Sequence, residues 1–168
     1  MSASAGPSSR TPATNFLRAL LWALPATVGY LVVTPFAALA VDRWLALPSL
    51  PRWCLWPGLV LLSAGFGGVL WTVWLLAAVG HGTPNPLAPP QRLVVRGPYR
   101  YSRNPMMLAA WSTGLGLALA LGSPALLAAI ALIAAGGVAY VRWVEEPGLR
   151  KRFGDSYRRL EEESPRWL

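Results

Sequence analysis

Residues Pro105–Val141 read PMMLAAWSTGLGLALALGSPALLAAIALIAAGGVAYV and contain no charged side chain. A transmembrane helix needs about 20 apolar residues to cross a hydrocarbon core of about 30 Å, so this run is too long for one span. Gly122-Ser123-Pro124 places a turn signal in its middle. The sequence therefore predicts a tight helical hairpin, with spans at about 106–121 and 125–144, whose Ala- and Gly-rich arms can pack closely.

Two further apolar runs precede this hairpin, Ala19–Val41 and Cys54–Val79. Each is long enough to cross a bilayer as a helix, which predicts spans at about 19–41 and 54–79. Pro25 and Pro35 lie inside the first run, where breaks in the helix are expected. The glycines of Gly65–Gly68 lie in the middle of the second run. They favour close helix packing over a dinucleotide-binding loop, which needs a preceding strand.

The composition supports a membrane assignment. Hydrophobic residues make up 54% of the chain and charged residues 13%, against about 25% charged residues in soluble domains. The predicted fold class is all-α, an integral membrane protein with about four transmembrane helices and a C-terminal amphipathic helix. That last helix is expected in the membrane interface at about 147–163, because Leu149, Phe153, Tyr157 and Leu160 share one side of a helical wheel.

The charge distribution predicts how the chain lies in the membrane. Residues 1–15 are rich in Ser, Ala, Pro and Thr and are predicted to be disordered, and residues 16–168 are predicted to form a single domain. Of 15 basic residues, 13 fall in the N-terminal segment, the Gly80–Asn104 loop and the tail. The positive-inside rule then places both termini in the cytoplasm. Basic residues at the ends of apolar runs indicate membrane lipid as a partner, and no nucleic acid.

Residue usage adds two expectations. All but one of the basic residues are arginine and alanine is abundant, which is typical of a GC-rich bacterial gene, so the bacterial inner membrane is the expected location. The chain has one cysteine, Cys54, and one histidine, His81, far apart in sequence. No metal site of the usual Cys and His ligands is therefore predicted.

Three segments outside the spans are candidates for chemistry, and each has a structural alternative. Arg96–Pro105 (RGPYRYSRNP) is either a basic, aromatic membrane anchor or a ligand-binding segment, with a proline suited to the first turn of a helix. Glu145-Glu146 either caps the following helix or serves a function, because carboxylates at this depth are costly. Gly80-His81-Gly82 either ends a helix or lets a cofactor approach the backbone closely.

Together these segments resemble the isoprenylcysteine carboxyl methyltransferase and phospholipid methyltransferase superfamily. The matching segments are, in order, Gly80–Pro84, Gly97–Tyr101, Arg103–Pro105, Glu145-Glu146, Phe153–Tyr157 and Pro165-Arg166. They cover roughly the second half of the chain, from Val79 onward. The resemblance implies an enzyme that is embedded in the membrane and transfers a methyl group from S-adenosylmethionine.

The resemblance also implies roles for particular residues. The expected cofactor-binding residues are Gly80, His81, Gly82, Tyr99, Tyr101, Arg103, Asn104, Pro105, Glu145 and Glu146, and the catalytic candidates are Arg100 and Asn104. Arg103 suits the carboxylate of the cofactor, because a guanidinium can bind it in a bidentate way. One carboxylate of the Glu145-Glu146 pair suits its ammonium or its ribose hydroxyls. The tyrosines can offer ring faces to the sulfonium region.

The sequence departs from the family pattern at three positions. Asn104 stands where the family has His, a variant associated with bacterial members. Met107 stands where it has Tyr, which removes an aromatic hydroxyl, and Ala109 stands where it has Gly. The acceptor is expected to be lipophilic or small, and a carboxylate, a thiol or a lipid amine would serve.

Two other functions stay open at this stage. A membrane reductase of the sterol-reductase type would have a similar C-terminal architecture and would bind NADPH. A non-enzymatic membrane scaffold or channel subunit would tolerate replacement of Arg103 and Glu146 without loss of ligand binding. Binding of S-adenosylmethionine separates the methyltransferase from both.

Overall fold

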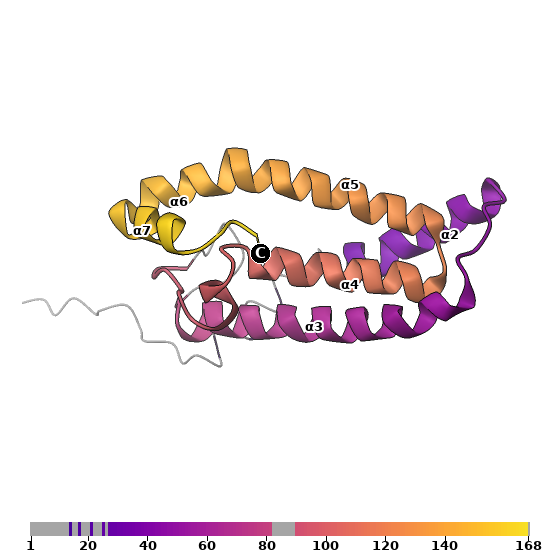
Figure 1. Ribbon diagram of the computed structural model, residues 1–168, viewed down its shortest axis with the longest axis horizontal. Coiled ribbons are helices and arrows are strands. Elements are labelled where there is room, and N and C mark those ends of the chain that lie inside the picture. The colour runs from indigo at the N-terminus through magenta and orange to yellow at the C-terminus, as the bar shows by residue number, and fades with distance from the viewer. Residues whose placement is uncertain are drawn as a thin grey trace, which may run out of the picture.

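The computed structural model describes residues 14, 17, 21, 25, 27–81 and 90–167. Every regular element in these residues is helical and none is a strand, in agreement with the predicted all-α class. Three long helices, α3 (Leu55–Ala78), α4 (Pro105–Leu121) and α5 (Pro124–Tyr140), run side by side along the molecule (Figure 1). The predicted disorder of residues 1–15 and the first part of the 19–41 span fall almost entirely outside the described residues.

Shorter helices lie at the two ends of this group. α2 (Thr34–Trp44) lies at the end where α4 turns into α5, and α6 (Glu146–Phe153) and α7 (Asp155–Glu163) lie at the opposite end (Figure 1). Two 3-10 turns, η2 (Arg52–Cys54) and η3 (Gly97–Arg100), precede α3 and α4. The start of α4 and the end of the chain therefore meet at the α6–α7 end.

Two π-helical turns, η1 (Gly29–Val33) and η4 (Val141–Glu145), have the same cause. Each ends just before a residue that is followed by proline, Thr34-Pro35 after η1 and Glu146-Pro147 after η4. Proline has no N–H, and its ring clashes with the carbonyl four residues earlier. In both places the N–H of the residue before proline donates to the carbonyl five residues earlier, so the helix widens and continues. The break expected at Pro35 takes this form.

α3 and α4 form the most extensive helix pair among the described elements. A Cβ on Gly65 would lie 2.5 Å from the backbone nitrogen of Thr113, and one on Gly116 would lie 2.3 Å from that of Leu62. Only glycine allows such an approach of two backbones. The close packing predicted for the Gly65–Gly68 segment is confirmed at Gly65, whereas α5 packs less extensively on α4 than the predicted tight hairpin implied.

Polar side chains fix the turn between α4 and α5. Gly122 has a φ of +65°, and Ser123 caps α5 by accepting a hydrogen bond from the N–H of Leu126 at 3.0 Å. Asp42, from the end of α2, accepts hydrogen bonds from the Ser123 hydroxyl and from the N–H of Ala125. A negative charge at a helix N-terminus is favourable, so Asp42 ties α2 to the start of α5.

α5, η4 and α6 form one continuous helix from Pro124 to Phe153. The helix therefore continues past the span end predicted near residue 144, because the π turn carries it past Pro147, and the bounds of the span stay a prediction. The chain reverses at Gly154, which has a φ of +51°, and α7 folds back toward the start of α4 (Figure 1). The prediction of one helix over 147–163 is wrong, since its two halves belong to different helices, and the interfacial position of this segment stays a prediction.

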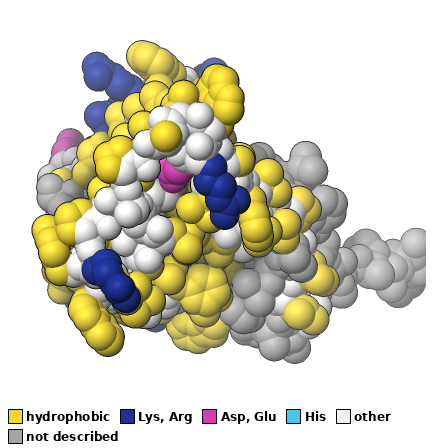
Figure 2. Space-filling view, turned by 90° about the vertical axis from the view of Figure 1, so that its right-hand side faces the viewer, with side chains coloured by type: hydrophobic (Ala, Val, Ile, Leu, Met, Phe, Trp, Pro, Cys, Tyr) yellow, Lys and Arg dark blue, Asp and Glu magenta, His cyan; other side chains and the backbone are white. Residues whose placement is uncertain are grey.

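Two described helices are long and apolar enough to cross a membrane, Arg52–Ala78 and Pro124–Phe153. Only 22% and 17% of their most apolar windows are buried inside the protein, so most of this apolar surface faces outward, as expected for contact with lipid. Seen from the α4–α5 turn, hydrophobic side chains cover much of the described surface (Figure 2). α4 is also apolar but has only 17 residues, and the count of four spans stays a prediction.

The α3–α4 contact leads to a stability prediction. Replacing Gly116 by Ala should destabilise the fold by about 1–3 kcal/mol, because the added methyl group meets backbone that cannot move aside cheaply. Thermal unfolding in detergent measures the effect. Gly67→Ala is the matched control on α3, since nothing lies within 4 Å of the added Cβ, and it should be neutral or slightly stabilising. Equal melting temperatures for the two variants would contradict the packing argument.

Candidate active site

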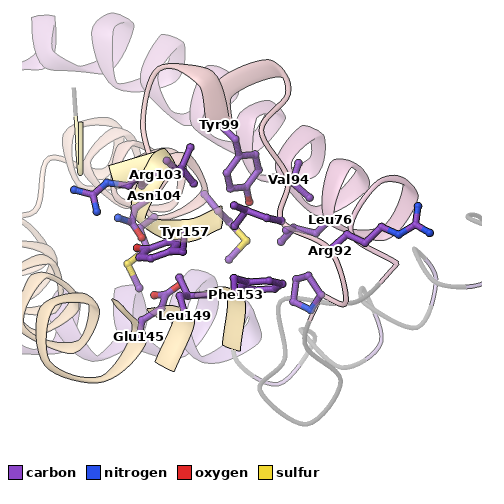
Figure 3. A pocket seen from close by; sticks show the side chains of 15 residues that line it. Leu76, Arg92, Val94, Tyr99, Arg103, Asn104, Glu145, Leu149, Phe153 and Tyr157 are labelled. Atoms are coloured by element: carbon purple, nitrogen blue, oxygen red, sulfur yellow. The ribbon is translucent and has the colours of Figure 1, made fainter. Parts of the chain in front are cut away.

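A cavity of about 160 Å³ lies between the start of α4, the segment that precedes it, and the α6–α7 hairpin (Figure 3). Its apolar lining consists of Leu76, Pro90, Leu93, Val94, Met106, Met107, Leu149, Phe153 and Leu160. Its polar lining consists of Arg92, Tyr99, Arg103, Asn104, Glu145 and Tyr157. Tyr99, Glu145 and Tyr157 reach the cavity from three different elements, whereas Arg92 extends away from it (Figure 3).

Gly80 holds the segment before α4 against the end of α3. Its carbonyl accepts hydrogen bonds from the N–H groups of Gln91 at 2.8 Å and Arg92 at 3.2 Å. A Cβ on Gly80 would lie 2.7 Å from the carbonyl oxygen of Leu76, so a larger residue would disturb this contact. Gly97, with a φ of +58°, then turns the chain into η3. The two glycines bring Tyr99 and the residues after it to the cavity.

Glu146 is a buried carboxylate that arginines surround. Its side chain is 2% exposed. Arg166 donates hydrogen bonds from Nε and Nη2 to its two oxygens at 2.7 and 2.8 Å, which makes a bidentate ion pair. Arg103 donates from Nη1 at 3.3 Å, and Nη2 of Arg150 lies 3.9 Å away. These contacts within the protein take up the charge of Glu146, as a buried carboxylate requires.

Arg103 connects this ion pair to Glu161 on α7. Its Nη1 also donates to Glu161 at 3.0 Å, and Arg150 donates to the same carboxylate at 2.8 Å. The hydrogen bonds and charges of Arg150, with those of Arg103, lower the pKa of the Glu161 carboxyl. The Nε of Arg103 is buried and has no hydrogen-bond partner among the described residues. Buried donors are normally satisfied, and the Arg103 guanidinium also interacts with the Tyr157 hydroxyl, which belongs to the same cavity lining.

Glu145 has a different environment from Glu146, although the two are adjacent in sequence. Neighbouring residues on a helix point in different directions, and Glu145 lines the cavity whereas Glu146 does not. Its side chain makes no hydrogen bond or ion pair within the described part of the chain. Burial raises the pKa of the Tyr99 phenol, and the negative charge of Glu145 raises it further. The cavity lining therefore contains a carboxylate without a described ion-pair partner and a protonated tyrosine.

The C-terminal segment Ser164–Trp167 is hydrogen-bonded to two residues of the cavity lining. The N–H of Arg103 donates to the carbonyl of Pro165 at 3.0 Å, and the side-chain amide of Asn104 donates to the carbonyl of Arg166 at 3.1 Å. Trp167 packs on Trp111 of α4, with ring centroids 5.0 Å apart. The segment therefore fixes the backbone that carries Arg103 and Asn104.

The structure brings part of the predicted site together. The cavity lining includes four of the predicted residues, Tyr99, Arg103, Asn104 and Glu145. Glu146 does not line the cavity but forms an ion pair with Arg103. The remaining predicted residues that the structure describes are Gly80, His81, Arg100, Tyr101 and Pro105, and none of them is among the lining residues.

These remaining residues have other places. Pro105 begins α4, as its sequence context predicted, and Gly80 follows the end of α3, where its N–H donates to the carbonyl of Leu75 at 3.3 Å. Arg100 and Tyr101 are exposed. His81 is exposed with a φ of +53°. Gly82 lies outside the described residues.

Sequence reasoning missed several residues of the site. Glu161 lies four residues after Tyr157, so the face predicted to be apolar also carries a carboxylate. Tyr157 and Leu160 were assigned to a membrane-facing surface, and they line the cavity instead. Arg166 was noted only as part of a closing motif, and nothing local in the sequence shows its pairing with Glu146. The four-residue spacing of Tyr157 and Glu161 was the signal in the sequence that could have placed Glu161 on the same helix face as Tyr157.

The lowered pKa of Glu161 predicts an acid-sensitive part of the folding stability. A carboxylate with a depressed folded-state pKa stabilises the fold above its usual value of 4.5, and this stabilisation is lost as the pH falls through the lower folded-state value. Between about pH 6 and about pH 3, thermal unfolding should therefore shift less in Glu161→Gln than in the wild type. Glu163→Gln, an exposed carboxylate on the same helix, should keep the wild-type shift. An unchanged pH dependence in Glu161→Gln would contradict this role.

Comparison with known proteins places the chain in a family. Residues 53–156 match the family model described as phospholipid methyltransferase. The match runs from η2 to the beginning of α7 and includes every cavity-lining residue except Tyr157 and Leu160. No curated protein and no solved structure gives a significant match. With more than half of its residues matched, the chain belongs to the phospholipid methyltransferase family, as the sequence motifs predicted.

Proposed function

We propose that this chain is a membrane methyltransferase that uses S-adenosylmethionine and methylates a lipophilic or small acceptor at the cytoplasmic face of a bacterial inner membrane. The observation that carries the proposal is the placement of Glu145 and Arg103 on the wall of one cavity, in a chain of this family.

The charges at the cavity fit the cofactor. S-adenosylmethionine carries a sulfonium and an ammonium, which are positive, and a carboxylate. Glu145 is suited to the ammonium, because its own charge is not compensated by the described residues. The Nε–H of Arg103, buried without a partner among these residues, is suited to the carboxylate. Tyr99 can offer its hydroxyl or its ring face.

The chain itself contributes positioning and exclusion of water. When bound, the cofactor supplies an electrophilic methyl group on its sulfonium. Met106 and Met107 on α4 and Phe153 on α6 give the cavity an apolar wall that suits a lipophilic acceptor and keeps water out. Holding two reactants in this orientation accounts for much of the barrier reduction in such transfers.

The two catalytic candidates from the sequence have different parts in this proposal. Asn104 lines the cavity, but its amide donates to the backbone of Arg166, so we assign it to positioning. Arg100 is exposed and does not line the cavity, so we assign it no direct contact with the cofactor. Glu146 supports Arg103 through their ion pair and leaves the cofactor contact to Glu145.

A nicotinamide cofactor fits this cavity less well. The pyrophosphate of NADPH needs cations or free N–H groups. In the described lining, Nη1 of Arg103 is paired with two carboxylates, which leaves its Nε–H for a single anionic group, and Arg92 extends outward. The uncompensated charge of Glu145 would repel a phosphate. These observations favour a cationic cofactor over the reductase alternative.

Calorimetry on detergent-purified protein tests the proposal. The wild type should bind S-adenosylmethionine and S-adenosylhomocysteine and should not bind NADPH. Glu145→Gln should weaken both adenosyl ligands by about tenfold or more, since an ion pair with a charged hydrogen bond is lost. The loss should be similar for both ligands, because both keep the ammonium and only one carries the sulfonium.

Glu162→Gln serves as the matched control, because it removes an exposed carboxylate from α7 without touching the cavity. It should bind both ligands as the wild type does. Absence of S-adenosylmethionine binding by folded wild-type protein would refute the proposed function. A loss confined to S-adenosylmethionine would instead refute the pairing of Glu145 with the ammonium.

A further inference from the structure

We propose that Arg166 is a positioning residue for the cofactor cavity. Through its ion pair with Glu146 it docks the segment Ser164–Trp167 onto Arg103-Asn104. The inference rests on the proposed function for its cofactor part. Arg166 lies beyond residues 53–156, which match the family model, and it does not line the cavity.

The first observation is the geometry of the pair. Arg166 is 34% exposed and Glu146 is 2% exposed, so the guanidinium reaches inward from the surface to a buried carboxylate. Both of its hydrogen bonds, at 2.7 and 2.8 Å, are short and together bidentate. A planar fork of this kind fixes direction as well as charge. The end of the chain is therefore tied to the junction of η4 and α6.

The second observation is what this tie places. The carbonyl of Pro165 accepts the N–H of Arg103 at 3.0 Å. The carbonyl of Arg166 accepts hydrogen bonds from the side-chain amide of Asn104 at 3.1 Å and from the hydroxyl of Ser102 at 3.3 Å. These hydrogen bonds hold the backbone from which Arg103 and Asn104 reach the cavity wall. Release of the segment would free both residues at once.

The third observation concerns charge. Without Arg166, the partners of Glu146 would be Arg103 at 3.3 Å and Arg150 at 3.9 Å. Arg103 is also paired with Glu161, at 3.0 Å. The stronger pull of an undercompensated, buried Glu146 would draw the Arg103 guanidinium away from its present position. Arg166 therefore sets the orientation of a cavity-lining cation that it does not itself contact.

A double-mutant cycle on the full chain tests the proposal. S-adenosylhomocysteine binding is measured by calorimetry in Arg166→Leu, Glu146→Gln and the double variant. Arg166→Leu should weaken binding by about tenfold or more. The double variant should bind S-adenosylhomocysteine at least as tightly as the single variant with the lower affinity. Two substitutions that break the same interaction do not have additive effects on the binding free energy. Arg166→Lys, which keeps the charge and loses the fork, should fall between wild type and Arg166→Leu.

Hydrogen exchange of the cofactor-free protein gives a second readout. The amide of Arg103, now bonded to Pro165, should exchange about tenfold faster or more in Arg166→Leu, with no further increase in the double variant. Arg158→Leu is the matched control, since it removes an arginine of α7 that is 74% exposed and faces only Asp155 at 3.6 Å among the described ion pairs. It should match the wild type in both measurements.

The outcomes separate this inference from the proposed function. If the wild type binds no adenosyl ligand, the proposed function fails, and the exchange cycle alone decides whether Arg166 positions Arg103 through Glu146. Wild-type affinity and wild-type exchange in Arg166→Leu would overturn the inference. The inference would also be overturned if the fold-changes of the two single variants multiplied in the double variant. Arg166 would then act independently of Glu146.

Discussion

The carboxylate of Glu146 is the point on which the arrangement of the site depends. A buried charge needs compensation, and removal of one partner from such a pair typically costs about 3–5 kcal/mol. Its partners come from three parts of the chain, Arg103 before α4, Arg150 on α6 and Arg166 near the end. No single helix could bring these three together. The ion-pair network therefore assembles the loop, the α6–α7 hairpin and the C-terminal segment into one site.

The helices place this carboxylate through two local effects. α3 and α4 approach closely because glycines at positions such as Gly65 and Gly116 leave room for backbone contact, which gives the loop before α4 a fixed base. The π turn before Pro147 lets the long helix continue beyond α4 and adds one residue to its turn. Glu145 and Glu146 follow at the end of that turn and face different surroundings. Two identical side chains thereby acquire different roles.

Local signals in the sequence predicted much of this fold. The helical class, the bounds of α3 and α4 to within a residue or so, the turn at Gly122 and the helix start at Pro105 all follow from apolar run length and from the backbone preferences of glycine and proline. The continuation of the helix past Pro147 was missed, because proline was read as a boundary. The pairing of Glu146 with Arg166 could not be read, since it joins residues that only the tertiary fold brings together.

The departures from the family pattern acquire different meanings in this structure. A Cβ added to Gly65 would lie 2.7 Å from the carbonyl oxygen of Ala109. A Cβ added to Gly68 would lie 3.0 Å from the Cβ of Ala109. Ala109 therefore belongs to the α3–α4 contact, where its extra methyl group is matched by glycines opposite. Met107 lines the cavity, so a thioether replaces an aromatic hydroxyl at the place where ligands would bind. A flexible, apolar thioether suits a lipophilic surface and removes a hydrogen bond that a polar acceptor would need. Under the proposed function, the departure at Met107 would bear on the choice of acceptor, while the departure at Ala109 bears on how the helices pack.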